Sequence, residues 1–248
     1  GNIYCPFVGA LKNVEIYDFA FNKLQMISYN VNGKLTSSDI AEQEEVAPLT
    51  KYEFNDATNP GKDSMGNYDL VLRDADGVAA GTGVVSASEG VATFNGTAGL
   101  HAASNGNDIS EVLKTFTLAF DIQASTAHGG WATPVGFGWN DWNPTKWGMF
   151  QFSGGSNLLR YSTGPNIDGT TNAFWAKEIG NVKTDGFQSV LLIAEPGKKI
   201  EVYLDGVLKY SHDLPQDFTF SDSQMRFALG GVSCWGNIYC PFIGSLKN

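Results

Sequence analysis

The chain has 248 residues, of which 26 are acidic and 16 basic, and its formal net charge is -10. This acidic excess argues against nucleic-acid binding, which needs a basic face. The sequence contains no run of about 18 apolar residues, so it predicts no membrane-spanning segment. A charged fraction of only 17%, with 29 glycines and 12% aromatic residues, is typical of an all-β sandwich, whose turns use glycine and whose packed faces use aromatic rings.

Short apolar or alternating runs predict strands along most of the chain. Alternation is clearest at Phe116–Ala124, where every second residue from Phe116 to Ile122 is apolar. Asp205-Gly206 lies between two alternating runs and predicts a hairpin with a type I′ turn. Helical periodicity is confined to 109–114 and 37–45. The expected strands are, in chain order, 14–17, 51–55, Val91–Asn95, Phe116–Ala124, Trp147–Phe152, 189–194, 200–210 and 225–229.

The first thirteen residues recur at the end of the chain. Residues 1–13 (GNIYCPFVGALKN) match residues 236–248 (GNIYCPFIGSLKN) and differ only at Val8/Ile243 and Ala10/Ser245. The match predicts that the chain is a window from a tandem array whose period is 236 minus 1, or 235 residues. Repetition multiplies weak contacts through avidity, so the pattern indicates a protein displayed on a surface.

The order of several short motifs resembles the bacterial laminin G-like domain of the concanavalin A-like jelly rolls. The motifs are KYEFND at 51–56, DSMGN at 63–67, VATFNG at 91–96, the strand at 116–122, EVYLDG at 201–206 and the run 7–21. The resemblance implies an antiparallel jelly-roll sandwich of two sheets, with the terminal strand beside the first one. It divides the chain into a terminal strand segment of the preceding repeat, or a permuted last strand, at 1–22, an inter-repeat linker at 23–51 and a jelly roll at 52–248.

Only one copy of the duplicated segment is expected to fill the terminal-strand position beside Tyr52. The first copy continues into 14–21, whereas the second ends at Asn248, so the first copy should complete the sheet. This closure is expected either within one chain or by strand exchange between neighbouring copies.

The three cysteines follow the repeat. Cys234 and Cys240 bracket a short loop and predict a disulfide on an oxidising surface, while Cys5 is the duplicate of Cys240. Buried free thiols, or competition of Cys5 for Cys234, are the alternatives.

Tryptophans and short polar residues concentrate between 131 and 147. Ring faces of sugars stack on indole, and their hydroxyls bind amides and carboxylates, so this composition suits a glycan site. Trp142 is expected at an exposed loop tip, and the core of the sandwich is the alternative place for the other tryptophans. The candidate ligand-binding residues are Trp131, Asn140, Asp141, Trp142, Asn143 and Trp147.

The resemblance also implies calcium near the loop after the first strand. Asp56, Asp63 and Asn67 are the candidate ligands, because calcium prefers carboxylate and carbonyl oxygens. Lys12 stands where the family usually has an acidic residue, and its ammonium group could replace the ion. An ordinary turn without metal is the other interpretation.

Catalytic motifs are lacking. The Glu-x-Asp-x-x-Glu pattern of jelly-roll glycosidases is absent, and Asp205 is expected to serve its own turn rather than pair with Glu201. The sequence therefore predicts a non-catalytic, secreted or cell-surface module of a repetitive microbial adhesin that recognises glycans. Binding of a host extracellular protein, such as a matrix glycoprotein or an immunoglobulin, through a sheet face is the first alternative. A structural spacer is the second.

Overall fold

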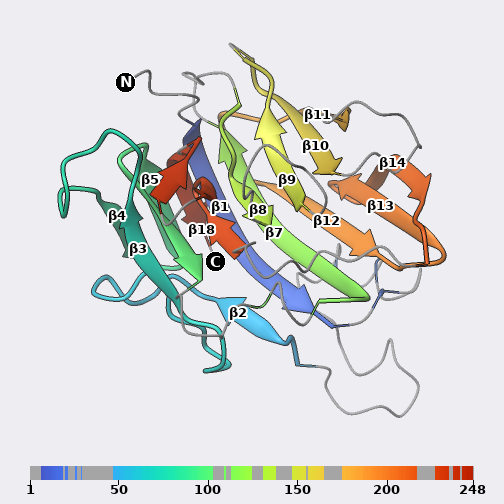
Figure 1. Cartoon of the computed structure of the whole chain (residues 1–248), viewed down its shortest axis with the longest axis horizontal. Helices are drawn as coiled ribbons and strands as arrows, with labels where there is room; N and C mark the ends of the chain where they lie inside the picture. The colour runs from blue at the N-terminus through green and yellow to red at the C-terminus, as the bar shows by residue number, and fades with distance from the viewer. Residues whose placement is uncertain are drawn as a thin grey trace.

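The computed structural model describes residues 7–18, 20–21, 26, 29, 47–102, 109, 113–124, 131–137, 147–154, 156–164, 175–216, 227–234, 237–240 and 242–247. Within this part of the chain the fold is an antiparallel β-sandwich, as predicted. Two large sheets, here named sheet A and sheet B, pack on one another, and a small hairpin accompanies them (Figure 1).

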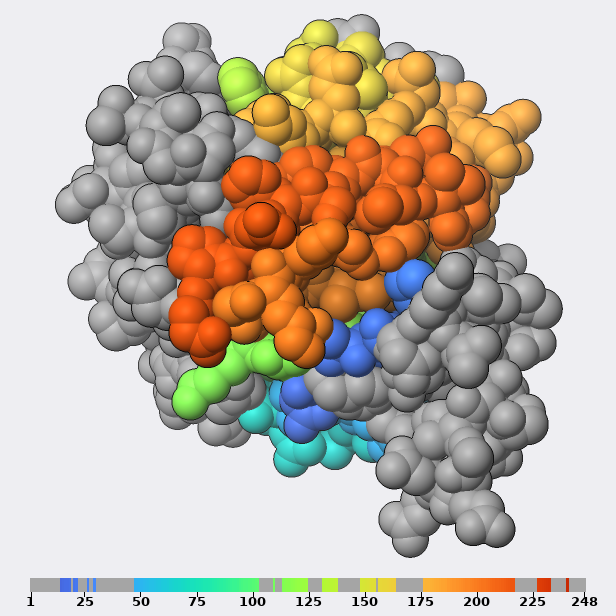
Figure 2. All heavy atoms as spheres, turned by 90° about the vertical axis from the view of Figure 1, so that its right-hand side faces the viewer, coloured from blue at the N-terminus to red at the C-terminus, as the bar shows by residue number. Residues whose placement is uncertain are grey.

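Sheet A has nine strands in the order β14-β13-β12-β7-β1-β18-β5-β4, with β2 paired to β1. Its edge strand β14 lies on the surface shown in Figure 2, within the orange band. The strands are β1 (Phe7–Tyr17), β2 (Thr50–Tyr52), β4 (Val85–Ser88), β5 (Val91–Asn95), β7 (Phe116–Ala124), β12 (Gln188–Ala194), β13 (Lys199–Leu204), β14 (Val207–Asp213) and β18 (Phe242–Lys247).

Sheet B has seven strands in the order β11-β10-β9-β8-β15-β6-β3. The small hairpin pairs β16 (Val232–Cys234) with β17 (Asn237–Tyr239) and packs against sheet B. The strands of sheet B are β3 (Leu70–Asp74), β6 (Ala98–Ala102), β8 (Val135–Phe137), β9 (Trp147–Phe152), β10 (Leu158–Gly164), β11 (Trp175–Asn181) and β15 (Phe227–Leu229).

Aromatic rings join the two sheets across the core. Phe120 of sheet A contacts Phe150 of sheet B with ring centroids 5.1 Å apart, and Phe116 contacts Phe137 at 5.5 Å. All four side chains are fully buried. Burying one such ring stabilises the fold by roughly 1.5–3 kcal/mol, so these pairs hold the sheets together.

The strands predicted by alternation occur at or near their expected bounds. Those at Val91–Asn95, Phe116–Ala124 and Trp147–Phe152 match residue for residue, and the predicted hairpin is β13–β14. The sequence did not predict the sheet B strands β3, β6, β8, β10 and β11. In β6 all five residues are buried, so the two faces cannot be told apart by polarity.

Part of the predicted linker belongs to the domain. Tyr29 is buried on the outer face of sheet A, where it packs with Phe21 and Tyr17. Thr50 and Lys51 already lie in β2, which pairs with residues 14–16 of β1. Within the expected linker at 23–51, Tyr29 therefore packs on sheet A, and Thr50 and Lys51 extend this sheet by a short strand. The predicted turns at 37–45 lie outside the described residues.

The predicted disulfide between Cys234 and Cys240 is not formed in this structure, where Cys240 is a buried free thiol. Cys234 pairs with Asn237 across the β16–β17 hairpin, so Cys240 lies three residues beyond the partner of Cys234. The strand β17 ends at Tyr239, and the chain leaves it at Cys240, whose φ angle is 48°. Cys5 lies outside the described residues.

Both copies of the duplicated segment join sheet A. As expected, β1 lies beside Tyr52, which pairs with Val14. The second copy, β18, does not pair with β2 but lies next to β1, and Figure 1 shows the blue and red strands side by side.

Candidate functional site

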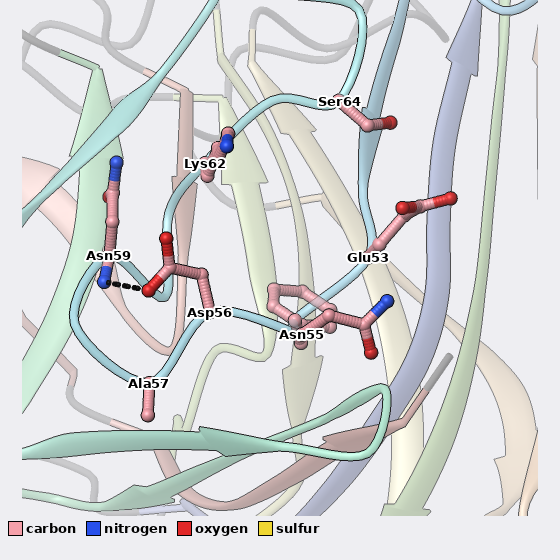
Figure 3. A pocket seen from close by; sticks show the side chains of 8 residues that line it. Glu53, Asn55, Asp56, Ala57, Asn59, Lys62 and Ser64 are labelled. Carbon is pink, nitrogen blue, oxygen red and sulfur yellow. Dashed lines mark hydrogen bonds between the residues drawn. The ribbon is translucent and has the colours of Figure 1, made fainter.

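An open pocket lies on the loop that follows β2. Its volume is about 470 Å³, and most of the side chains that line it are polar (Figure 3). The lining residues are Glu53, Phe54, Asn55, Asp56, Ala57, Asn59, Lys62 and Ser64, and they are here called the loop pocket.

The backbone of this loop turns sharply at Phe54. Its φ angle is 53°, in the left-handed region that bulky residues rarely adopt, and its ring is buried in the core. Burial of the ring compensates for the strained backbone. Because of this turn, β2 ends at Tyr52, two residues before Phe54. The strand predicted to reach Asn55 is therefore shorter, and the exposed Asn55 lines the loop pocket instead.

Asp56 shapes the rim of the loop pocket. Its Oδ1 accepts hydrogen bonds from the Thr58 hydroxyl at 2.7 Å and from the backbone N–H of Thr58 at 2.9 Å. It also accepts one from the backbone N–H of Asn59 at 3.1 Å, drawn as a dashed line in Figure 3. These bonds, above all the one from the Thr58 hydroxyl, lower the pKa of the Asp56 carboxyl group. The loop therefore presents a carboxylate at its rim.

Asp63 directs its carboxylate at the backbone of its own loop. Its Oδ1 accepts backbone N–H bonds from Lys51 at 2.9 Å and Met65 at 3.0 Å. Its Oδ2 accepts them from Asn67 and Tyr68, both at 3.0 Å. A carboxylate offers about four lone-pair positions, and four donors occupy them, so none is left for an ion.

The three candidate calcium ligands differ in their surroundings. Asp63 is buried with its carboxylate directed at the backbone, whereas Asp56 lines the loop pocket and Asn67 is exposed. The Asn67 amide donates to the Met65 carbonyl at 3.4 Å. The turn interpretation of this segment agrees with the structure. No cluster of three or more His, Cys, Asp or Glu suited to a metal occurs among the described residues.

The predicted tryptophan site is only partly described. The backbone N–H of Trp131 donates to the carbonyl of Phe152, the last residue of β9, whereas Trp147 is the first. The five steps between them correspond to about 17 Å, so the two tryptophans lie at opposite ends of one strand. Trp131 is 45% exposed with a φ of 72°. Asn140, Asp141, Trp142 and Asn143 lie outside the described residues, as does Trp139.

Glu201 and Asp205 have structural partners, as the sequence predicted for Asp205. The carboxylate of Asp205 accepts hydrogen bonds from the side chain of Gln188 at 2.9 Å and the backbone N–H of Ser189 at 3.0 Å. Glu201 accepts one from the Tyr203 hydroxyl at 2.7 Å. Neither carboxylate belongs to the loop pocket.

Sequence reasoning missed most of the loop pocket. It selected Asp56 but not Glu53, Asn55, Asn59 or Lys62. The available signal was the density of short polar residues between Glu53 and Ser64, directly after an apolar strand. Their convergence depends on the turn at Phe54, which no local pattern indicates.

No protein-family model and no curated protein matches this sequence. Among solved structures, domain 4 of AbnA, a GH43 extracellular arabinanase from Geobacillus stearothermophilus in complex with arabinotriose, is similar in fold. The TM-score is 0.50 at 19% identity, over 78% of this chain and 87% of that one.

Two further structures are more distant. One is a structure of botulinum neurotoxin type C, a toxin whose cell entry depends upon interaction with two ganglioside molecules. Its TM-score is 0.38 at 11% identity, and the match covers 67% of this chain and 39% of that one. Endo-β-1,4-glucuronan lyase from the fungus Trichoderma reesei has a TM-score of 0.34 and 14% identity, over 64% and 82%. The arabinanase domain supports the jelly-roll type of β-sandwich for this chain.

Proposed function

We propose that this chain is a non-catalytic glycan-binding module of a repetitive, extracellular microbial surface adhesin of the laminin G-like type. The observation that carries the glycan proposal is the loop pocket, in which carboxylate, amide, ammonium and hydroxyl groups converge on one open hollow. Such groups bind sugar hydroxyls by donating and accepting hydrogen bonds. No helix in the described part of the chain is long and apolar enough to span a membrane.

Several polar groups of the loop pocket remain open to a ligand. Asn55 and Lys62 are exposed, and Glu53 forms an ion pair with Lys51 at 3.2 Å while still lining the hollow. Phe54 is buried and offers no stacking surface. Sugar stacking in our proposal therefore falls to a tryptophan, for which Trp131 and Trp142 are the candidates.

The carboxylates argue for binding rather than hydrolysis. A glycosidase needs a general acid whose pKa is raised toward neutrality. In Asp56 the pKa is lowered instead, chiefly by the bond from the Thr58 hydroxyl, so this group stays ionised. Asp63 and Asp205 are committed to their loops by hydrogen bonds from backbone amides.

Recognition of a host protein is the weaker proposal. It calls for a broad exposed apolar face, which interfaces usually present at their centre. The large apolar side chains exposed in the described part of the chain are spread over separate elements, apart from the neighbours Val207 and Leu208. A spacer role gains no support from the loop pocket.

The test is a glycan array probed beside a panel of host extracellular proteins. Asn55→Ala and Lys62→Ala should each weaken binding of the selected glycan about three- to tenfold, because each removes one or two hydrogen bonds. The control is Lys209→Ala, an exposed lysine on the edge strand β14, and it should leave binding unchanged.

The outcomes separate the alternatives. Loss of binding in Trp142→Ala, with Asn55→Ala unaffected, would place the site in the tryptophan loop. Binding to a host protein but to no glycan would refute the glycan proposal. Release of reducing sugar from a bound polysaccharide would refute the non-catalytic assignment.

A further inference from the structure

The two copies of the duplicated segment lie in register with each other. Strands β1 and β18 are parallel, with Phe7 opposite Phe242, Gly9 opposite Gly244 and Leu11 opposite Leu246. Each pair joins equivalent positions of the repeat, 235 residues apart. All other pairs among the described strands are antiparallel. The strands β1 and β18 are parallel to each other because both run antiparallel to the same two neighbours, β5 and β7.

On β5 the two copies share one register. Ala10 and Leu11 of the first copy face Thr93 and Ala92. Gly244 and Lys247 of the second copy, equivalent to Gly9 and Lys12, face Phe94 and Val91. The partners therefore follow one another without a gap along β5, as though a single strand were paired there.

The same holds on β7. Gly9 and Lys12 of the first copy face Ala124 and Asp121. Ser245 and Leu246 of the second copy, equivalent to Ala10 and Leu11, face Gln123 and Ile122. The partners of the two copies thus follow one another without a gap along β7, and both copies pair with this strand in one register.

One strand between β5 and β7 uses both of its hydrogen-bonding edges, since successive N–H and C=O groups point alternately to the two sides. Two strands cannot both lie in one register between the same two neighbouring strands. We propose that the space between Val91–Asn95 and residues 121–124, here named the half-slot, is a strand-binding site. It takes either copy of the duplicated segment, from its own chain or from a second copy of this chain.

The first copy remains attached when the second takes the half-slot. A register shift between Lys12 and Glu15 divides β1 at this point. Beyond the shift, Val14 and Ile16 are fully buried and pair only with β2 and β7. A chain with two copies and one half-slot therefore has one spare copy, which fits the half-slot of another molecule and links the two by β-augmentation.

The matched positions Leu11 and Leu246 allow a direct test by proline substitution, since proline removes a ladder hydrogen bond. Leu11→Pro and Leu246→Pro alone should each lower the melting temperature by less than about 2 °C, because the intact copy fills the half-slot. The double variant should lose roughly 5–10 °C. If Leu11→Pro alone costs as much as the double variant, or if the double variant costs nothing, the proposal is overturned.

Exchange between molecules is tested by mixing. The double variant has an unfilled half-slot and the unmodified chain has a spare copy, so an equimolar mixture should form a 1:1 complex in size-exclusion chromatography with light scattering. The control mixes the double variant with Leu246→Pro, whose single intact copy is engaged, and it should remain monomeric. Monomers in both mixtures would refute exchange with a second copy. These readouts do not depend on glycan binding.

Discussion

At the scale of single residues, the loop after β2 is organised by two aspartates with different tasks. Asp63 is buried and satisfies four backbone N–H groups, which fold the segment 63–68 back toward Lys51. Asp56 holds its turn at the surface and lines the loop pocket. Both aspartates were selected as candidate metal ligands, and in this loop both accept hydrogen bonds from backbone N–H groups.

Asp63→Asn should destabilise the domain by about 2–3 kcal/mol, because an amide has a single acceptor oxygen and leaves buried N–H groups without a partner. Urea unfolding followed by fluorescence measures the change. Asn67→Ala, at an exposed side chain with one long hydrogen bond, is the control and should stay within about 0.5 kcal/mol. Added EDTA should not alter the melting temperature, and a clear decrease would restore the calcium hypothesis.

Trp131 combines exposure with backbone strain, which is common at binding sites. Trp131→Gly and Trp131→Ala both remove the indole, but only glycine adopts a φ of 72° without penalty. The glycine variant should therefore be about 1 kcal/mol more stable than the alanine variant. If the indole stacks on a sugar, both variants should lose glycan affinity equally. Equal stability of the two variants would show that the strain is absent in solution.

At the scale of elements, the β13–β14 hairpin depends on its two-residue turn. Asp205 and Gly206 have φ angles of 48° and 72°, the positive values of a type I′ turn. The Asp205 carboxylate also ties the turn to β12 through Ser189. Local sequence thus selects both the hairpin and its attachment to the neighbouring strand.

Gly206→Ala should lower the free energy of unfolding by about 1 kcal/mol. An alanine in the left-handed region is strained by about 1–2 kcal/mol, but alanine also reduces the conformational entropy of the unfolded chain, which offsets part of this strain. Gly186→Ala is the matched control, because a Cβ there meets no atom within 4 Å and the backbone needs no positive φ. Thermal unfolding of both variants measures the difference. An equal effect at the two positions would contradict the proposed strain.

At the scale of the whole molecule, a buried polar group lies on the outer face of sheet A. The carboxylate of Glu15 accepts hydrogen bonds from the hydroxyls of Tyr17 at 3.0 Å and Tyr29 at 2.9 Å, and Lys51 lies 3.5 Å from it. Burial, followed by the negative charge of Glu15, raises the pKa of both tyrosines above the ordinary value of 10.0. The segment that contains Tyr29 is attached to the sheet through this group.

Stability should therefore fall at alkaline pH. Because the folded state holds these phenolic protons more tightly than the unfolded chain, their stabilising effect is complete below about pH 10 and is lost as pH rises further. Urea midpoints between pH 8 and 11, with tyrosinate absorbance at 295 nm, measure this. Tyr29→Phe should lower stability at pH 8 and weaken the alkaline decrease. A constant midpoint up to pH 11 would contradict the assignment.

The sequence by itself determined those features that depend on neighbours along the chain. Alternation in Phe116–Ala124 placed β7, Asp205-Gly206 placed a hairpin, and the thirteen-residue match revealed the duplicated segment. These signals are local because side-chain period and turn conformation are set by a few consecutive residues.

Only the tertiary structure decided which distant groups meet. It showed that Asp63 is saturated by backbone amides, that Trp131 and Trp147 lie at opposite ends of β9, and that polar residues after Phe54 form a pocket. It also placed residues 7–12 and 242–247 against the same two strands, β5 and β7, in one register. Strand order and register between distant segments depend on packing of the whole sandwich, so no local pattern contains them.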